Sequence, residues 1–227
     1  MIRIIHLTDF HLNEQNLKEW NSIVRKAMIS KLEKLHEENA INLIAYTGDL
    51  IEKGGKDFRS AQKAFEIFKD EVIFPITSVL RLSINQFMII PGNHDIERNK
   101  DNEITEIGLK GFFNKDINNV TKYITASIKQ NNYAGGIERI KSYKEFERSL
   151  YNESDTNNKL SIFGSSFRHL MNEESVGVCC LNSAWRSYDN EDAGNLIIGE
   201  EQLQNSYDFI SNCDIKIAMI HHPLDWL

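Results

Sequence analysis

Four short apolar runs, each followed at once by polar side chains, constrain the fold of this sequence more than any other feature. The runs are Ile2–Leu7, Ile41–Tyr46, Phe87–Ile90 and Ile215–Ile220. Short, continuously apolar runs are typical of strands covered on both faces, as in parallel sheets. The intervals between the first three runs leave room for a loop, a helix and a return strand. The sequence therefore predicts an α/β fold whose strand ends share one edge.

The polar segments after these runs are rich in potential metal ligands. They are Asp9-Phe10-His11, Gly48-Asp49, Gly92-Asn93-His94-Asp95 and His221-His222-Pro223. Any one of them is common at the end of an ordinary strand, whereas four in this order are not. Carboxylate, imidazole and amide donors without a thiolate suit a pair of hard or borderline divalent metal ions. We therefore expect the four segments to meet at one two-metal site.

This order of segments resembles the calcineurin-like metallophosphoesterase family. The resemblance covers nearly the whole chain, and its most specific motif is Gly92-Asn93-His94-Asp95. It implies a four-layer α/β/β/α sandwich, with two mixed sheets face to face and helices outside. It also implies a hydrolase that cleaves a phosphoester with a water that two divalent ions (manganese, iron or zinc) have activated to hydroxide.

The resemblance further implies a role for each ligand. Asp9 and His11 would bind the first metal, and Asn93 and His221 would bind the second. Asp49 would bridge both metals, a role that suits a carboxylate because it offers two oxygens.

Five other polar residues lie beside these ligands in the sequence. His94 would be the catalytic residue, which stabilises the phosphoryl group or protonates the leaving oxygen. Glu52 would orient that imidazole, although an exposed loop glutamate explains the sequence equally well. Asp95 would brace its loop rather than bind metal. His222 would contact the substrate; either His221 or His222 could be the metal ligand, and His221 is preferred because the family's ligand lies two residues before the proline. Lys53 could contact phosphate, although a lone loop lysine is usually only solvated.

One departure from the family pattern concerns the end of the chain. The family's last motif, a Gly-His-x-His segment that gives one imidazole to each metal, does not follow His221 before the sequence stops at Leu227. We therefore expect one metallophosphoesterase domain over 1–227 that is truncated at its C-terminus, with further C-terminal domains in a longer parent protein. Each metal would then lack one imidazole, and metal binding would be weak or partial.

Residues 98–159 differ in composition from the rest of the chain, being polar and rich in Asn, Lys and Glu. A structureless loop of that length would be unusual in a compact domain. We predict an inserted helical cap, anchored by apolar side chains at Phe112, Phe113, Tyr143, Phe146 and Leu150. The cap would leave from the metal edge and could restrict the substrate. A solvated helical excursion without contact to the site is an equally open alternative.

Apolar spacing predicts the remaining elements. Helices are expected over Leu17–Glu38, from Phe58 to Phe68, from Ile76 to Leu80 and over Glu200–Ile210. In the last of these, Leu203, Tyr207 and Ile210 should face inward. A further strand is expected over Ser175–Leu181.

Length, charge and cysteine usage exclude several classes of protein. With 227 residues, 41% of them hydrophobic, the chain can bury one core as a single domain. A net charge of −7 argues against a dedicated nucleic-acid-binding surface, but not against a nuclease, because bound divalent ions offset local negative charge. The 3 cysteines lie in or beside apolar runs, as reduced buried thiols do. No secretory signal and no membrane-spanning run is visible, so we expect a cytoplasmic protein without membrane contact.

The substrate class is less constrained by the sequence. Asp-x-His combined with Gly-Asn-His-Asp resembles both the cyclic-nucleotide phosphodiesterase and the DNA-repair nuclease branches of the family. The protein-phosphatase branch usually has Gly-Asn-His-Glu instead. The leading hypothesis is therefore a phosphodiesterase acting on nucleic acid or a nucleotide. The alternative is a non-catalytic regulatory or interaction module of a larger multidomain protein that retains the fold.

Overall fold

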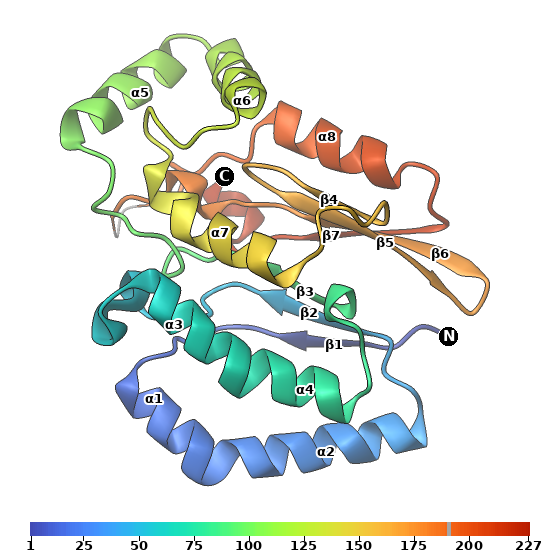
Figure 1. The fold of residues 1–227 in the computed structure, drawn as a ribbon. Coiled ribbons are helices and arrows are strands. Elements are labelled where there is room, and N and C mark those ends of the chain that lie inside the picture. The colour runs from blue at the N-terminus through green and yellow to red at the C-terminus, as the bar shows by residue number, and fades with distance from the viewer. Residues whose placement is uncertain (190–191) are drawn as a thin grey trace.

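A computed structural model describes residues 1–189 and 192–227, which form two stacked sheets with helices outside them (Figure 1). The first sheet is parallel and has the order β1 (Ile4–Leu7), β2 (Leu43–Thr47) and β3 (Phe87–Ile90). The second sheet has the order β4 (Asn158–Leu160), β5 (Ser165–Met171), β6 (Glu174–Cys180) and β7 (Ile215–Met219). The predicted four-layer α/β/β/α sandwich is confirmed, but the expectation of two mixed sheets is wrong for the first sheet, whose described strands are all parallel.

The second sheet is mixed. β4, β5 and β6 pair antiparallel, whereas β6 and β7 pair parallel. β5 and β6 form a hairpin that turns at Asn172 and Glu173, whose φ values of 50° and 71° are those of a type I′ turn. The sequence predicted β6 and β7 but missed β5, because that strand begins with two serines and carries Arg168 and His169 at its centre.

The helices outside the first sheet are two long, continuous segments. In the first, α1 (Glu14–Glu19) and α2 (Arg25–Glu38) are joined by a π-helical turn at Trp20–Val24. In the second, α3 (Ala61–Phe68) and α4 (Phe74–Val79) are joined by a π-helical turn at Lys69–Ile73. The predicted first helix therefore exists but begins earlier. The two short helices predicted before β3 are one continuous helix.

The main core lies between the sheets. One cluster of buried apolar side chains contains Leu43 and Met88 of the first sheet, on the face turned away from the outer helices, and Phe167 and Val178 of the second. Full burial of such a side chain stabilises the fold by about 1.5–3 kcal/mol. This shared core holds the ends of the two sheets in a fixed relation to each other.

Helix α8 (Glu200–Ile210) covers the outer face of the second sheet. Ile210 is buried as predicted, but Leu203 and Tyr207 are about half exposed, and the prediction for them is wrong. The helix instead turns Gln202 and Ser206 inward. Gln202 explains this choice, because its side-chain amide pairs with the backbone N–H and C=O of Asn182, at 2.6 and 3.2 Å.

The polar segment 98–159 contains three helices in two different settings. α5 (Glu103–Lys115) and α6 (Asn118–Gln130) form a hairpin beyond the end of the second sheet (Figure 1), where Phe113 packs with Trp185. α7 (Lys141–Leu150) belongs to the main core, where Phe146 stacks on Phe65 at 4.7 Å. Phe112 is 41% exposed, so its predicted anchoring role is wrong. That the segment caps the site stays a prediction.

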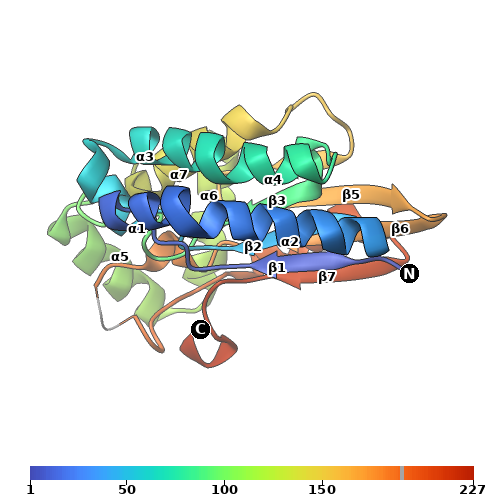
Figure 2. The ribbon, with the colours of Figure 1, turned by 90° about the horizontal axis from the view of Figure 1, so that it is seen from below.

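The edge strands β1 and β7 run along the same side of the sandwich (Figure 2). Residues along both strands are alternately more and less exposed, and Ile4 is 37% exposed. The prediction that every apolar run is covered on both faces is therefore wrong for these two strands. All three cysteines are free and buried, as predicted. Within the described ranges, none of the helices combines the length and the apolar character needed to cross a bilayer.

Candidate metal centre

The carboxyl ends of β1, β2, β3 and β7 bring side chains from all four polar segments together. Asp9, Asp49 and His221 offer one group of donor atoms, and His11, Asp49 and His94 offer a second. Within each group the donor atoms lie within 4.8 Å of one another. Asp49 is common to both groups and is almost fully buried. The arrangement therefore provides two adjacent positions for a cation that share one carboxylate.

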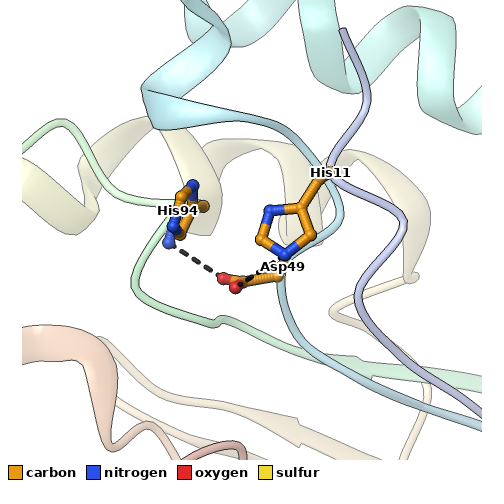
Figure 3. Close-up of side chains that lie close together, drawn as sticks. All are labelled: His11, Asp49 and His94. Carbon is orange, nitrogen blue, oxygen red and sulfur yellow. Dashed lines mark hydrogen bonds and ion pairs between the residues drawn. The ribbon is translucent and has the colours of Figure 1, made fainter. Parts of the chain in front are cut away.

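The two oxygens of Asp49 have different partners (Figure 3). Oδ1 accepts a hydrogen bond of 2.9 Å from the backbone N–H of His94. Oδ2 lies 3.4 Å from Nε2 of His11 and 3.6 Å from Nε2 of His221. The loop after β3 thus fixes the carboxylate, while Oδ2 faces imidazoles that come from different sheets.

His221 is held in the orientation and tautomer that a metal ligand requires. Its Nδ1 lies 2.6 Å from the backbone carbonyl oxygen of Thr47, so Nδ1 carries the proton and donates it. In the neutral ring Nε2 is then the nitrogen with a free lone pair, and it faces Asp49. Metal-binding histidines commonly donate their second ring N–H to a backbone carbonyl in this way.

Backbone strain is concentrated at the same place. The φ values of Asp9, His11 and Asp49 are 57°, 49° and 55°. They lie in the left-handed region, which residues other than glycine rarely adopt. Such residues cost on the order of 1–3 kcal/mol each and cluster at functional sites. The surrounding hydrogen bonds therefore hold these ligands in conformations that an isolated loop would avoid.

Two glycines make room for the ligands. A Cβ atom at Gly92 would overlap the carboxylate of Asp49, and one at Gly48 would lie 2.6 Å from Nδ1 of His221. Gly48 also has a φ of +94°. These contacts give a physical reason for a glycine directly before Asp49 and directly before Asn93.

Glu52 lies between two imidazoles. Its Oε2 atom is 3.0 Å from Nδ1 of His11 and 3.1 Å from Nδ1 of His94, within ion-pair distance but not aligned for hydrogen bonds. The two rings meet edge to face with centroids 4.6 Å apart. Burial by itself would raise the pKa of Glu52, but His94, Lys53 and His11 outweigh it and lower that pKa. Burial lowers the pKa of His94, against the opposing charges of Asp49 and Glu52.

Asp95 and Asn93, both in the loop after β3, have different surroundings. Asp95 is completely buried and accepts hydrogen bonds from the backbone N–H groups of Ile51 (2.9 Å) and Gly92 (2.8 Å). Burial, and then the negative charge of Asp49, raise the pKa of the Asp95 carboxyl group. Asn93 is half-buried and lines an open cleft next to His94.

His222 lies apart from the shared carboxylate. Its exposed fraction is 3%, and its Nδ1 atom is 2.7 Å from Oγ of Ser183, which is also buried. Burial, and then the neighbouring His221, lower the pKa of His222 to about 3. This position gives the expected substrate contact no support, because a buried side chain offers a substrate little surface.

Sequence reasoning missed several supporting groups. The carbonyl of Thr47 orients His221, and the hydroxyl of Thr8 donates to Oδ2 of Asp9 at 2.5 Å. A backbone carbonyl has no signature in a sequence, and a single threonine at a strand end carries too little signal. Both contacts depend on how the strand ends meet in space.

The donor set fits divalent metal ions. The carboxylates of Asp9 and Asp49 lie in one group with His221, and two neighbouring carboxylates repel each other unless a cation lies between them. Oxygen and imidazole donors without a thiolate suit manganese, iron or zinc. The locked tautomer of His221 adds a ligand prepared in advance.

Comparisons with known proteins agree with this geometry. The family model described as calcineurin-like phosphoesterase matches residues 2–226. Among curated proteins, the chain is similar to an uncharacterized metallophosphoesterase-like protein, YydB, of Bacillus subtilis (strain 168). The two are 25% identical over 100 residues, which make up 43% of this chain and 18% of the relative. The match therefore spans less than a fifth of that protein's length.

Proposed function

The chain belongs to the calcineurin-like phosphoesterase family, and we propose that it hydrolyses a phosphodiester of nucleic acid or a nucleotide with the help of two divalent metal ions. The observation that supports this most strongly is the sharing of Asp49 by two groups of donor atoms. A two-metal hydrolytic site requires two cations held close together, and a shared carboxylate provides this.

The proposed ligands follow the strand ends. Asp9 and His11, whose Nε2 lies 3.6 Å from Oδ1 of Asp9, would hold one ion, Asn93 and His221 the other, and Asp49 both. The observed donor groups divide the side chains differently, with Asp9 beside His221 and His11 beside His94. Bound ions of this kind acidify a water molecule to near-neutral pKa and neutralise the charge on phosphoryl oxygens. The left-handed backbone at Asp9, His11 and Asp49 keeps the carboxylates and imidazole in place before any substrate arrives.

His94 would act on the substrate. Because its Nδ1 faces Glu52, its Nε2 is the nitrogen left to contact a substrate oxygen. When protonated, the ring would hold one proton on Nδ1 against the Glu52 carboxylate and give the other, from Nε2, to the leaving oxygen. Glu52 would thus be a positioning residue, acting through the imidazole rather than on the substrate.

Hydrolysis of bis-p-nitrophenyl phosphate with added manganese tests this proposal. We expect turnover by the unmodified chain, faster than turnover of p-nitrophenyl phosphate, and at least a hundredfold loss in Asp49→Asn. The matched control is Asp70→Asn, which makes the same replacement at an exposed position on the helices outside the first sheet.

Elemental analysis of the same samples completes the test. At saturating manganese we expect up to two ions per chain, bound weakly, and fewer in Asp49→Asn. Two bound ions without any turnover of either ester would contradict the proposed activity and would favour the non-catalytic module instead. Faster hydrolysis of the monoester would contradict the preference for diesters.

A further inference from the structure

An open cleft of about 780 Å³ is lined in part by Asn93 and His94, and Asn93 is the one proposed metal ligand in its lining. One wall is the segment 53–56 after β2, and the other is the segment 96–100 after β3. When one phosphate of a substrate lies at the metal centre, the part of the substrate on one side of that phosphate would therefore lie in this cleft.

The cleft concentrates positive charge in a chain whose net charge is −7. Its lining includes the cationic side chains of Lys53, Lys56, Arg98 and Lys100 and the single carboxylate of Glu97. The metal ligands supply none of these cations. Positive charge next to, but outside, a phosphoesterase centre is suited to phosphates other than the one being cleaved.

The lysines of the cleft are able to change partners. Lys53 lies 3.4 Å from Glu52, and Lys100 lies 3.6 Å from Glu97, with both lysine side chains more than half exposed. Exposed ion pairs of this kind contribute only about 0–1 kcal/mol. A phosphate can therefore compete for these ammonium groups at little cost.

A backbone hydrogen bond ties the first wall to the loop after β3, from which the second wall continues. The N–H of Gly54 donates to the carbonyl of His94 at 2.8 Å. Lys53, Gly54 and Gly55 all have left-handed φ values, of 46°, 63° and 75°. A lysine in this conformation is unfavourable by itself, and strained residues held by their surroundings are typical of binding sites.

We propose that this cleft binds the phosphates that flank the scissile one, so that the substrate is a polynucleotide strand rather than a cyclic mononucleotide. The inference rests on the proposed phosphodiesterase function and narrows its substrate. A cyclic mononucleotide has one phosphate and leaves the exposed lysines of the cleft without a phosphate, whereas a strand brings one phosphate per nucleotide. In the described part of the chain no Phe, Tyr or Trp lines the cleft, and His94 is its one aromatic ring, which favours contact with the backbone over stacking of successive bases.

The test measures binding of a fluorescent single-stranded oligonucleotide by anisotropy, in chelator, so that no strand is cut. The double variant Lys56→Gln/Lys100→Gln removes two cleft charges. The matched control Lys31→Gln/Lys34→Gln removes two exposed charges from α2. Each phosphate contact on a single strand contributes about 0.7 to the slope of log K against log salt. We expect the slope to become shallower by about 1.4 in the cleft variant only.

Equal slopes in the cleft variant and the control would overturn the proposal. So would a nucleoside triphosphate or a cyclic mononucleotide that displaces the oligonucleotide at equal phosphate concentration. The proposed activity is read separately, by turnover of bis-p-nitrophenyl phosphate with manganese. If the chain turns over this small diester but binds the strand independently of Lys56 and Lys100, the proposed function stands and the inference about the cleft is wrong.

Discussion

The Oε2 atom of Glu52 lies 3.1 Å from Nδ1 of His94, so a carboxylate after β2 faces the imidazole proposed to act on the substrate. The same oxygen lies 3.0 Å from Nδ1 of His11, the imidazole that follows β1. One side chain therefore influences both a proposed metal ligand and the proposed catalytic residue.

Glu52→Gln should lower kcat by about tenfold to a hundredfold, because an amide keeps the shape of the carboxylate but does not stabilise a protonated His94. Metal content should stay at the level of the unmodified chain. The acid side of the pH–rate profile should also shift, which a purely structural role would not produce. Glu66→Gln, at an exposed pair with Lys63, is the matched control. Loss of metal in Glu52→Gln would mean that Glu52 acts mainly by holding His11.

His94→Ala should lower kcat by roughly a hundredfold to ten-thousandfold, the usual contribution of a general acid–base group. Bound metal, measured by elemental analysis, should be retained. The alternative is concrete, because the ring of His94 shares a donor group with His11 and Asp49. Loss of one ion per chain would show that His94 is a ligand.

Gly92→Ala should abolish metal binding, because the added methyl group would overlap the Asp49 carboxylate and displace it. Calorimetric titration with manganese would measure the loss. Gly111→Ala is the control, since nothing lies within 4 Å of a Cβ there and the residue is in the middle of α5. That change should raise stability by roughly 0.5–1 kcal/mol. Normal titration of Gly92→Ala would show that the loop after β3 can move aside.

Stability should fall as the pH drops from 6.5 towards 4, in part through His169. Burial lowers the pKa of this imidazole from 6.5 to about 4, and its Nε2 is buried without a hydrogen-bond partner. Between these values the unfolded chain binds the proton and the folded chain does not, so acid favours unfolding, by on the order of 3 kcal/mol in total. Urea unfolding across this pH range should show that the free energy of unfolding falls less in His169→Gln than in the unmodified chain. Parallel plots of this free energy against pH for the two proteins would contradict this account.

A buried ion pair on α7 provides a test of stability away from the site. Lys144 is completely buried and pairs with Glu147, and its Nζ also donates to Ser165 at 3.1 Å. Glu147→Leu should cost about 3–5 kcal/mol, because it leaves a buried ammonium group unpaired. Lys144→Met/Glu147→Leu should recover most of that loss in thermal unfolding. A double variant as unstable as the single one would show that packing, and not the unpaired charge, is responsible.

Some of the fold could be predicted because it depends on local patterns. The apolar runs gave β1, β2, β3 and β7 from neighbouring residues alone, and the spacing of apolar residues gave the helix that ends at Glu38. Local patterns failed where tertiary packing determines which side chains of an element are buried. Leu203 is at an apolar position of α8, yet the helix turns Gln202 inward because that amide pairs with Asn182.

The sequence by itself determined which donors exist and that each follows a strand. The sequence specifies the chemical identity of each proposed ligand: Asp9, His11, Asp49, Asn93 and His221. The short apolar runs before these residues predict the strands that they follow. Both are properties of residues within a few positions of one another.

Only the tertiary structure decided how these donors meet. His221 comes from the second sheet, yet it points at Asp49 of the first, because a shared core fixes the two sheets face to face. The pairing of β2 with β3 in the first sheet sets Glu52 against His94 and lines Lys56 and Lys100 along one cleft. These distances join residues far apart in the chain, and their energies depend on burial and close contact that no local periodicity encodes.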